Sequence, residues 1–162
     1  MKEKIKVLMV CHGNICRSPM GEYIMKHLVC EKFGVKTPEE AGFHIESMGV
    51  SSEELTHDIY PPAKRMLASK GVPFGAHRAR RVAASDYEKF DYFLGASNRH
   101  VRIMKSLFEG DKEGKVMLMR EFVSGPMGKT DVSDPWYTGD FETAFEDIRE
   151  GCEAFLAQVL EE

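Results

Sequence analysis

The sequence predicts an α/β fold in which helices cover both faces of a parallel β-sheet. Short apolar runs alternate along the chain with helical patterns, which is typical of parallel strands joined by helical crossovers. Residues 5–10 are almost continuously apolar, as expected of a strand that is buried on both faces. Near the end of the chain, one face of a predicted helix is apolar at Phe141, Phe145, Ile148, Cys152, Phe155 and Val159.

The other elements follow from the same patterns. A first helix should start with Ser18 as its N-cap and Pro19 in its first turn. The last helix should have Asp140 as its N-cap. The expected strands cover residues 5–10, 43–48, 90–94 and 115–119, and the other helices cover 61–70 and 99–108. Residues 124–134, with Gly125, Pro126 and Gly128, form the longest expected loop.

Length and composition indicate one soluble domain that spans residues 1–162. The chain is 43% hydrophobic and 30% charged, with a formal net charge of −4 and no long run of one sign. This balance argues against binding of nucleic acid or insertion into a membrane. Four cysteines do not make a disulfide scaffold, and Met1–Lys4 lead directly into a strand rather than a signal peptide. We therefore expect a cytoplasmic protein, with the oligomeric state left open and a monomer as one option.

The first candidate site is the loop from Cys11 to Arg17, between the first strand and the first helix. In open α/β sheets, ligands bind at the carboxyl ends of the strands, and the N–H groups at a helix N-terminus bind anions. Gly13 lets the backbone curl closely, and the guanidinium of Arg17 can hold two oxygens of a tetrahedral oxyanion. The same positive field favours the thiolate of Cys11. The loop therefore suits phosphoryl transfer through a cysteinyl phosphate.

One other interpretation of this loop remains open, and another can be excluded. The spacing of Cys11 and Arg17 also arises by chance, and most buried cysteines are packing residues. A Walker-type nucleotide loop is excluded, because no Gly-x4-Gly-Lys-Ser/Thr motif is present.

The second candidate site is the segment DVSDPWYTGDF, residues 131–141. Asp134 precedes a proline, which holds its backbone extended. A carboxyl group beside Trp136 and Tyr137 would be partly desolvated, which suits a general acid. The alternative is that Asp134 caps a turn and the two aromatic residues pack in the core. Asp131 and Asp140 are weaker candidates for the acid.

Together, VCHGNICRSP near the start and DPWYTGDF near the end resemble the low-molecular-weight protein tyrosine phosphatases. The resemblance implies a flavodoxin-like three-layer fold with a four-stranded parallel sheet, and hydrolysis of phosphotyrosine in proteins without a metal or cofactor. It implies Cys11 as nucleophile, Arg17 as phosphate clamp and Asp134 as general acid and base. It also assigns the loop amides from His12 to Ser18 to the phosphoryl oxygens. The substrate-binding residues would be His12, Gly13, Asn14, Ile15, Cys16, Ser18, Trp136 and Tyr137.

The same resemblance implies supporting roles around the loop. Asn14, Ser18, Ser47 and His77 match a network that braces it, and Ser18 would also activate the Cys11 thiolate. Cys16 could form a reversible disulfide with Cys11, or serve only in packing.

Several positions depart from the family pattern. His12 stands where an apolar residue or threonine is common; it could add positive charge beside the phosphate or point to solvent. Glu53 or Glu54 occupies the pocket rim in place of an aromatic residue. GASNRH, residues 95–100, leaves Ser97 where an aspartate is usual, and His100 is expected to have no chemical role.

Two rival functions can be stated. A thiol–disulfide enzyme such as an arsenate reductase needs further cysteines in a mobile segment, and residues 72–99 contain none. A non-catalytic anion-binding module would not need Asp134 together with Cys11.

Overall fold

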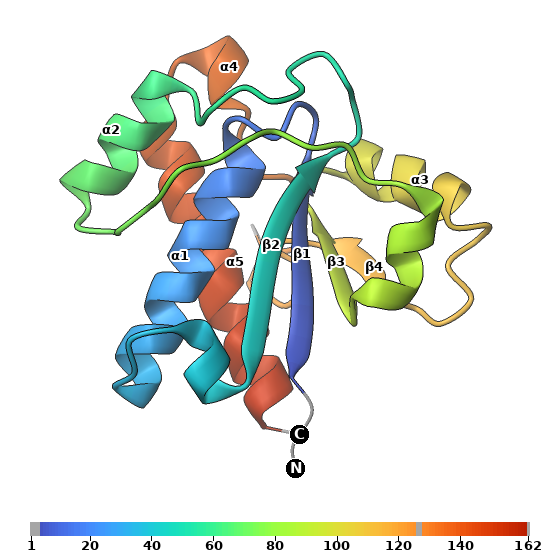
Figure 1. The fold of residues 1–162 in the computed structure, drawn as a ribbon, viewed down its shortest axis with the longest axis horizontal. Coiled ribbons are helices and arrows are strands. Elements are labelled where there is room, and N and C mark those ends of the chain that lie inside the picture. Colours follow the sequence, from blue (N-terminus) through green and yellow to red (C-terminus); the bar gives the residue numbers. More distant parts are fainter. Residues whose placement is uncertain (1–3, 126–127, 162) are drawn as a thin grey trace.

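The computed structural model describes residues 4–125 and 128–161, and it confirms the predicted α/β class (Figure 1). One sheet of four parallel strands has the order β2-β1-β3-β4. The strands are β1 (Ile5–Cys11), β2 (Phe43–Gly49), β3 (Tyr92–Gly95) and β4 (Val116–Leu118). Met1–Glu3, expected to precede the first strand directly, and Pro126 in the expected long loop lie outside the described residues.

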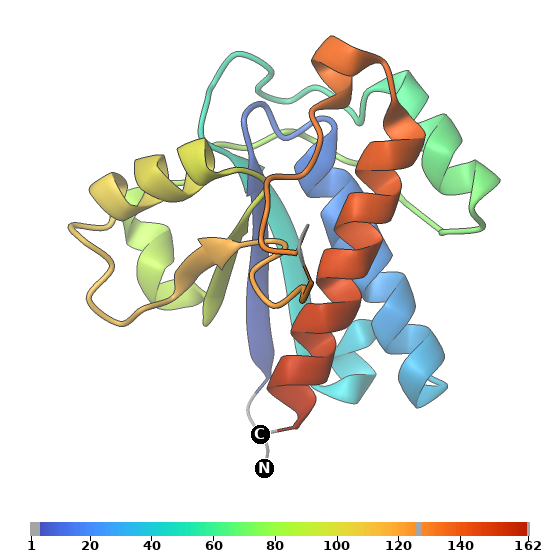
Figure 2. The ribbon, with the colours of Figure 1, turned by 180° about the vertical axis from the view of Figure 1, so that it is seen from behind.

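Helices cover both faces of the sheet, which gives the three layers of the expected fold. On one face lie α1 (Arg17–Phe33), α2 (Pro61–Ser69) and α5 (Phe141–Leu160); Figure 2 shows α1 and α5 running side by side. The opposite face is covered by α3 (Asn98–Leu107) and the 3-10 helix η2 (Ala84–Lys89). Three short elements were not expected from the sequence: η2, η1 (Pro38–Ala41) and α4 (Pro135–Thr138).

The central strand β1 is buried on both of its faces, which accounts for its continuous apolar run. Val7 and Met9 belong to the core under α1 and α5, whereas Leu8 and Val10 belong to the core under α3. All four side chains are 0% exposed. Successive residues of a strand point to opposite faces, so the part of a strand that lies between two helical layers is apolar at successive positions.

Two predicted boundaries, the start of the third strand and the start of the first helix, differ in the structure. The strand expected from Phe90 begins instead at Tyr92, which pairs with Val7. The ring of Phe90 is buried against that of Phe93, with centroids 5.8 Å apart, so Phe90 is apolar without belonging to the ladder. Ser18 is not an N-cap: α1 begins at Arg17, and its N-cap residue makes no side-chain capping bond.

The strand order places a binding crevice at the carboxyl end of β1. The chain passes from β1 to β2 on one side and then crosses to β3 on the other side. A reversal of this kind opens a crevice at the carboxyl ends of the central strands, where α/β proteins bind ligands. The segment from Cys11 to Arg17 lies at this point (Figure 1). Within the described ranges, none of the helices has the length and apolar character needed to cross a membrane.

Candidate active site

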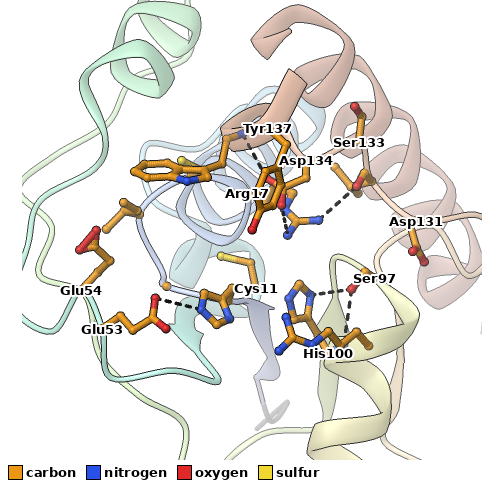
Figure 3. Close-up of a pocket in the computed structure, with 17 residues that line it drawn as sticks. Cys11, Arg17, Glu53, Glu54, Ser97, His100, Asp131, Ser133, Asp134 and Tyr137 are labelled. Atoms are coloured by element: carbon orange, nitrogen blue, oxygen red, sulfur yellow. Dashed lines mark hydrogen bonds and ion pairs between the residues drawn. The ribbon is translucent and has the colours of Figure 1, made fainter. Parts of the chain in front are cut away.

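A cavity of about 740 Å³ opens at the carboxyl end of β1 (Figure 3). Four parts of the chain line it: the loop after β1, the rim at Glu53 and Glu54, the start of α3 and the segment 131–137. Cys11, Arg17 and Asp134 all contribute to its wall. Of the expected substrate-binding residues, the cavity is lined by His12, Gly13, Ile15, Cys16, Trp136 and Tyr137. Asn14 and Ser18 are not part of the cavity lining, and each is 0% exposed.

Neighbouring backbone fixes the path of the loop. Val50 N donates to Cys11 O at 3.0 Å, and Ser51 N donates to His12 O at 2.9 Å, so the loop continues the hydrogen bonding of the β1–β2 pair. A Cβ atom on Gly49 would lie 2.6 Å from His12 O, and this close approach requires glycine. Farther along, Tyr60 N donates to Ile15 O at 2.9 Å.

Asn14 holds the loop from the inside. Its φ of 61° lies in the left-handed region, which asparagine tolerates better than most residues. Its Nδ2 donates to Ser18 Oγ at 2.8 Å and to Ser47 Oγ at 3.0 Å. Its Oδ1 accepts from Arg80 N at 3.0 Å, and its backbone oxygen lies 2.6 Å from His77 Nε2. The four residues of the expected bracing network are therefore in contact, and Arg80 is an addition.

The hydroxyl of Ser18 connects this network to Cys11. Because the amide nitrogen of Asn14 can only donate, Ser18 Oγ accepts from it and keeps its own proton for another partner. That partner is Cys11 Sγ, 2.9 Å away. The hydroxyl thus accepts from Asn14 and donates to the thiol. Because α1 already begins at Arg17, Ser18 lies inside its first turn and cannot be its N-cap.

Glu22 extends the network into the core and was missed by the sequence analysis. Ser47 Oγ donates to Glu22 Oε1 at 2.7 Å, and Lys26 Nζ donates to Glu22 Oε2 at 2.6 Å. Glu22 is 8% exposed, so its charge is balanced by Lys26 one turn later in the same helix. The sequence feature that could have identified Glu22 is its place between the apolar residues Met20 and Ile24, which are both buried.

Arg17 and Asp134 meet although 117 positions separate them in the sequence. Nη2 of Arg17 lies 3.3 Å from Asp134 Oδ2, and Nη1 donates to Val132 O at 3.2 Å. Arg17 is 7% exposed, whereas the side chain of Asp134 is 32% exposed. This pairing of the carboxylate with a guanidinium was not foreseen from the sequence.

Asp134 also caps α4, as the alternative interpretation expected. Its Oδ1 accepts from Trp136 N at 3.1 Å. The other half of that interpretation was wrong, because the two aromatic side chains are not in the core. Trp136 is 53% exposed and Tyr137 is 85% exposed, and both line the cavity, where Figure 3 labels Tyr137. The indole is held from one side by Tyr60, with ring centroids 4.9 Å apart.

Ile15 and Cys16 form a small apolar cluster with Ala79 under the cavity wall. Burial raises the pKa of the Cys16 thiol to about 12, and the charges of Cys11 and Asp134 act in the same direction. At neutral pH, Cys16 is therefore a protonated thiol.

The rim of the cavity consists of paired side chains. Nε2 of His12 lies 3.3 Å from Glu53 Oε2, so His12 faces a carboxylate rather than free solvent. Its Nδ1 is buried and has no hydrogen-bond partner among the described residues. Glu54 Oε2 lies 3.0 Å from His57 Nδ1.

Ser97 and His100 form a pair at the opposite wall. Ser97 is the N-cap of α3, and its Oγ lies 3.0 Å from His100 Nδ1. His100 is 2% exposed and lines the cavity, a position that the sequence analysis did not foresee. The described residues contain no cluster of three or more His, Cys, Asp or Glu side chains able to hold a metal ion.

Solved structures and sequences of known proteins share this architecture. The crystal structure of YfkJ from Bacillus subtilis superposes with a TM-score of 0.90 at 29% identity, covering 99% of this chain and 97% of that one. The crystal structure of DARP, a Drosophila arginine phosphatase, gives a TM-score of 0.82 at 27% identity, covering 96% of this chain and 98% of that one.

Comparison of sequences matches YfkJ again and adds a yeast relative. The low molecular weight protein-tyrosine-phosphatase YfkJ of Bacillus subtilis is 31% identical over 98% of this chain and 97% of its own length. The low molecular weight phosphotyrosine protein phosphatase of Schizosaccharomyces pombe is 35% identical over 86% of this chain and 85% of its own length. The model of the low molecular weight phosphotyrosine protein phosphatase family matches residues 6–162. The chain belongs to the low molecular weight phosphotyrosine protein phosphatase family.

Proposed function

We propose that the chain hydrolyses phosphotyrosine, an aryl phosphate monoester, through a cysteinyl-phosphate intermediate. The observation that supports this most directly is that Cys11, Arg17 and Asp134 line one cavity. A nucleophile, an anion clamp and a carboxyl group are the three parts that this reaction requires. An anion-binding module would need neither the thiol nor the acid.

In the first step, Cys11 Sγ attacks the phosphorus and the bond to the phenolic oxygen breaks. Asp134 protonates that oxygen as tyrosine leaves. The loop amides from His12 to Ser18 and the guanidinium of Arg17 hold the other phosphoryl oxygens. The Ser18 hydroxyl, 2.9 Å from Sγ, donates to the thiolate before the attack.

In the second step, water attacks the phosphocysteine. Asp134, now a carboxylate, takes a proton from the water, the P–S bond breaks and inorganic phosphate leaves. The contact between Arg17 and Asp134 is part of this cycle. Phosphoryl oxygens compete for the guanidinium, so substrate binding frees the carboxyl group for proton transfer. No step needs a metal or cofactor.

The walls of the cavity favour an aryl leaving group over phosphoarginine. Ile15 offers neither a donor nor an acceptor to a guanidinium, and each unpaired polar group that is buried costs about 1–3 kcal/mol. A phenyl ring can lie against Ile15, Trp136 and Tyr137 without that cost. Phosphoserine is too short to bring its phosphorus to Cys11. The substrates would thus be phosphotyrosine-containing proteins of the cytoplasm, bound by one domain spanning residues 1–162.

Cys11→Ser is the variant that tests this function. It should abolish turnover of a phosphotyrosine peptide while phosphate still binds, because the loop amides remain. Arg17→Lys should fail almost as badly, since an ammonium cannot make paired contacts in one plane. Cys30→Ser, at a partly exposed cysteine of α1, is the matched control and should retain wild-type activity. Activity of Cys11→Ser within tenfold of wild type would refute the nucleophile, and thiol-dependent arsenate reduction without phosphatase turnover would favour the rival enzyme.

A further inference from the structure

His100 is a buried polar residue in the cavity wall that the proposed reaction does not use. It lies in the first turn of α3, directly after the carboxyl end of β3. His100 lines the cavity and is only 2% exposed, so the small accessible part of its side chain faces the cavity. Figure 3 shows its ring on the side of Ser97 that faces Cys11.

The hydrogen bonds of the Ser97 hydroxyl indicate which tautomer the imidazole of His100 adopts. Ser97 Oγ accepts from the backbone N–H of His100 at 3.4 Å and lies 3.0 Å from His100 Nδ1. Ser97 is 9% exposed, and its hydroxyl proton has no other acceptor within the described part of the chain. Donation from the hydroxyl to Nδ1 is the arrangement that gives this proton an acceptor, and it leaves the ring proton on Nε2.

The charge of the ring is fixed as well. Burial, together with the positive charges of Arg17, His12 and Arg99, lowers the pKa of His100 to about 3. The imidazole is therefore neutral at neutral pH. Its Nε2–H is an uncharged donor at the wall of the cavity, and no hydrogen bond joins it to a residue of the described ranges.

We propose that His100 binds the phosphoryl group of the substrate, with its Nε2–H donating a hydrogen bond to a phosphoryl oxygen. This inference rests on the proposed function, which puts a phosphoryl group in this cavity. A phosphoryl group is the fitting acceptor, because the aryl ring offers no oxygen except the one that Asp134 protonates. A neutral donor adds to the grip of Arg17 without bringing a second cation next to it.

Histidine signals in the wild-type protein test the contact directly. With ¹⁵N-labelled histidine at pH 7, Nε2 of His100 should carry the proton and Nδ1 should not. Inorganic phosphate should shift the Nε2–H signal, and Arg17→Ala, which removes the clamp, should suppress the shift. An Nδ1–H tautomer, or a His100 signal that stays unmoved at saturating phosphate, would overturn the proposal.

Two variants measure how much the contact contributes. His100→Phe keeps a ring without a donor and should weaken phosphate binding roughly 10- to 100-fold, the usual effect of a hydrogen bond to a charged group. His100→Gln keeps a neutral donor near the place of Nε2 and should stay within about threefold of wild type. His27→Gln, at a histidine paired with Glu31 on α1, is the control and should leave the affinity unchanged. Equal affinity in His100→Phe and wild type would refute the contact.

The same measurements separate this proposal from the proposed function. If the wild type turns over phosphotyrosine peptide while the His100 signals ignore phosphate, the role of His100 is wrong and the function stands. If phosphate shifts the His100 signals but the wild type hydrolyses no phosphotyrosine, the function is wrong and the anion contact stands.

Discussion

Replacing Asn14 should destabilise the protein more than any exposed polar change, because this residue is fully buried and its side chain makes three hydrogen bonds. Asn14→Ala removes the contacts to Ser18, Ser47 and the backbone N–H of Arg80. At roughly 1 kcal/mol for each hydrogen bond, their loss lowers the free energy of unfolding by about 3 kcal/mol. Alanine must also adopt the φ of 61°, which costs about 1 kcal/mol more. The expected total is about 4 kcal/mol.

Asn14→Gly separates the two contributions. Glycine loses the same three hydrogen bonds but adopts a positive φ without strain, so its loss should be about 3 kcal/mol. Asn98→Ala is the control: this asparagine is exposed and contacts Asp131, and its loss should stay below about 1 kcal/mol.

Urea unfolding at neutral pH measures these differences, provided that the slope against denaturant stays constant across the variants. A loss below about 1.5 kcal/mol for Asn14→Ala would refute the hydrogen-bond account. A glycine variant less stable than the alanine variant would refute the strain account.

Three further predictions concern the chemistry of the site. Asp134→Ala should lower the turnover of phenyl phosphate by roughly 10²–10⁴ and that of a nitro-substituted phenyl phosphate by less, since the better leaving group needs no proton; equal losses would make Asp134 structural. Mild peroxide should inactivate the protein reversibly, because a Cys11 sulfenic acid can condense with Cys16 to a disulfide and water, and Cys16→Ser should then recover more poorly with reductant. The pKa of Cys16 is about 12 and the thiolate is the attacking form, so this disulfide should form faster as the pH rises above 7. If Cys16→Ser recovers as well as wild type, Cys16 is only a packing residue. Wild type should have a higher kcat/KM for a phosphotyrosine peptide than for a matched phosphoarginine peptide, and both values should far exceed that for phosphoserine. Ile15→Thr supplies a hydroxyl and should shift the ratio of the first two values toward phosphoarginine. An unchanged ratio, or a wild-type preference for phosphoarginine, would contradict the role given to Ile15.

Local features of the site could be predicted from the sequence, and long-range features could not. Cys11 and Arg17 lie in one turn after an apolar strand, so the pattern placed them at the carboxyl end of the sheet. The contact of Arg17 with Asp134 depends on how α5 and the preceding segment pack, which no local pattern encodes; the resemblance to a family supplied that pairing of segments, but not the ion pair.

Two features of the site were not foreseen because they arise from tertiary contacts. Ser18 before a proline is a typical helix start, yet its hydroxyl is taken by Cys11 and Asn14. His100 looks like one more polar residue of an amphipathic helix, and only the packing of α3 against the sheet places it in the cavity wall.

The attachment of the loop to β2 has a consequence for the energetics of binding. Because Cys11 and His12 accept hydrogen bonds from Val50 and Ser51, the loop becomes ordered when the sheet forms. The conformational entropy of the loop is therefore lost during folding, before any anion arrives. An incoming phosphoryl group meets amides that already have their final directions, so little of its binding free energy is spent on ordering the protein. Substitutions that loosen the end of β2 should then appear as weaker anion affinity, even where no residue of the cavity has changed.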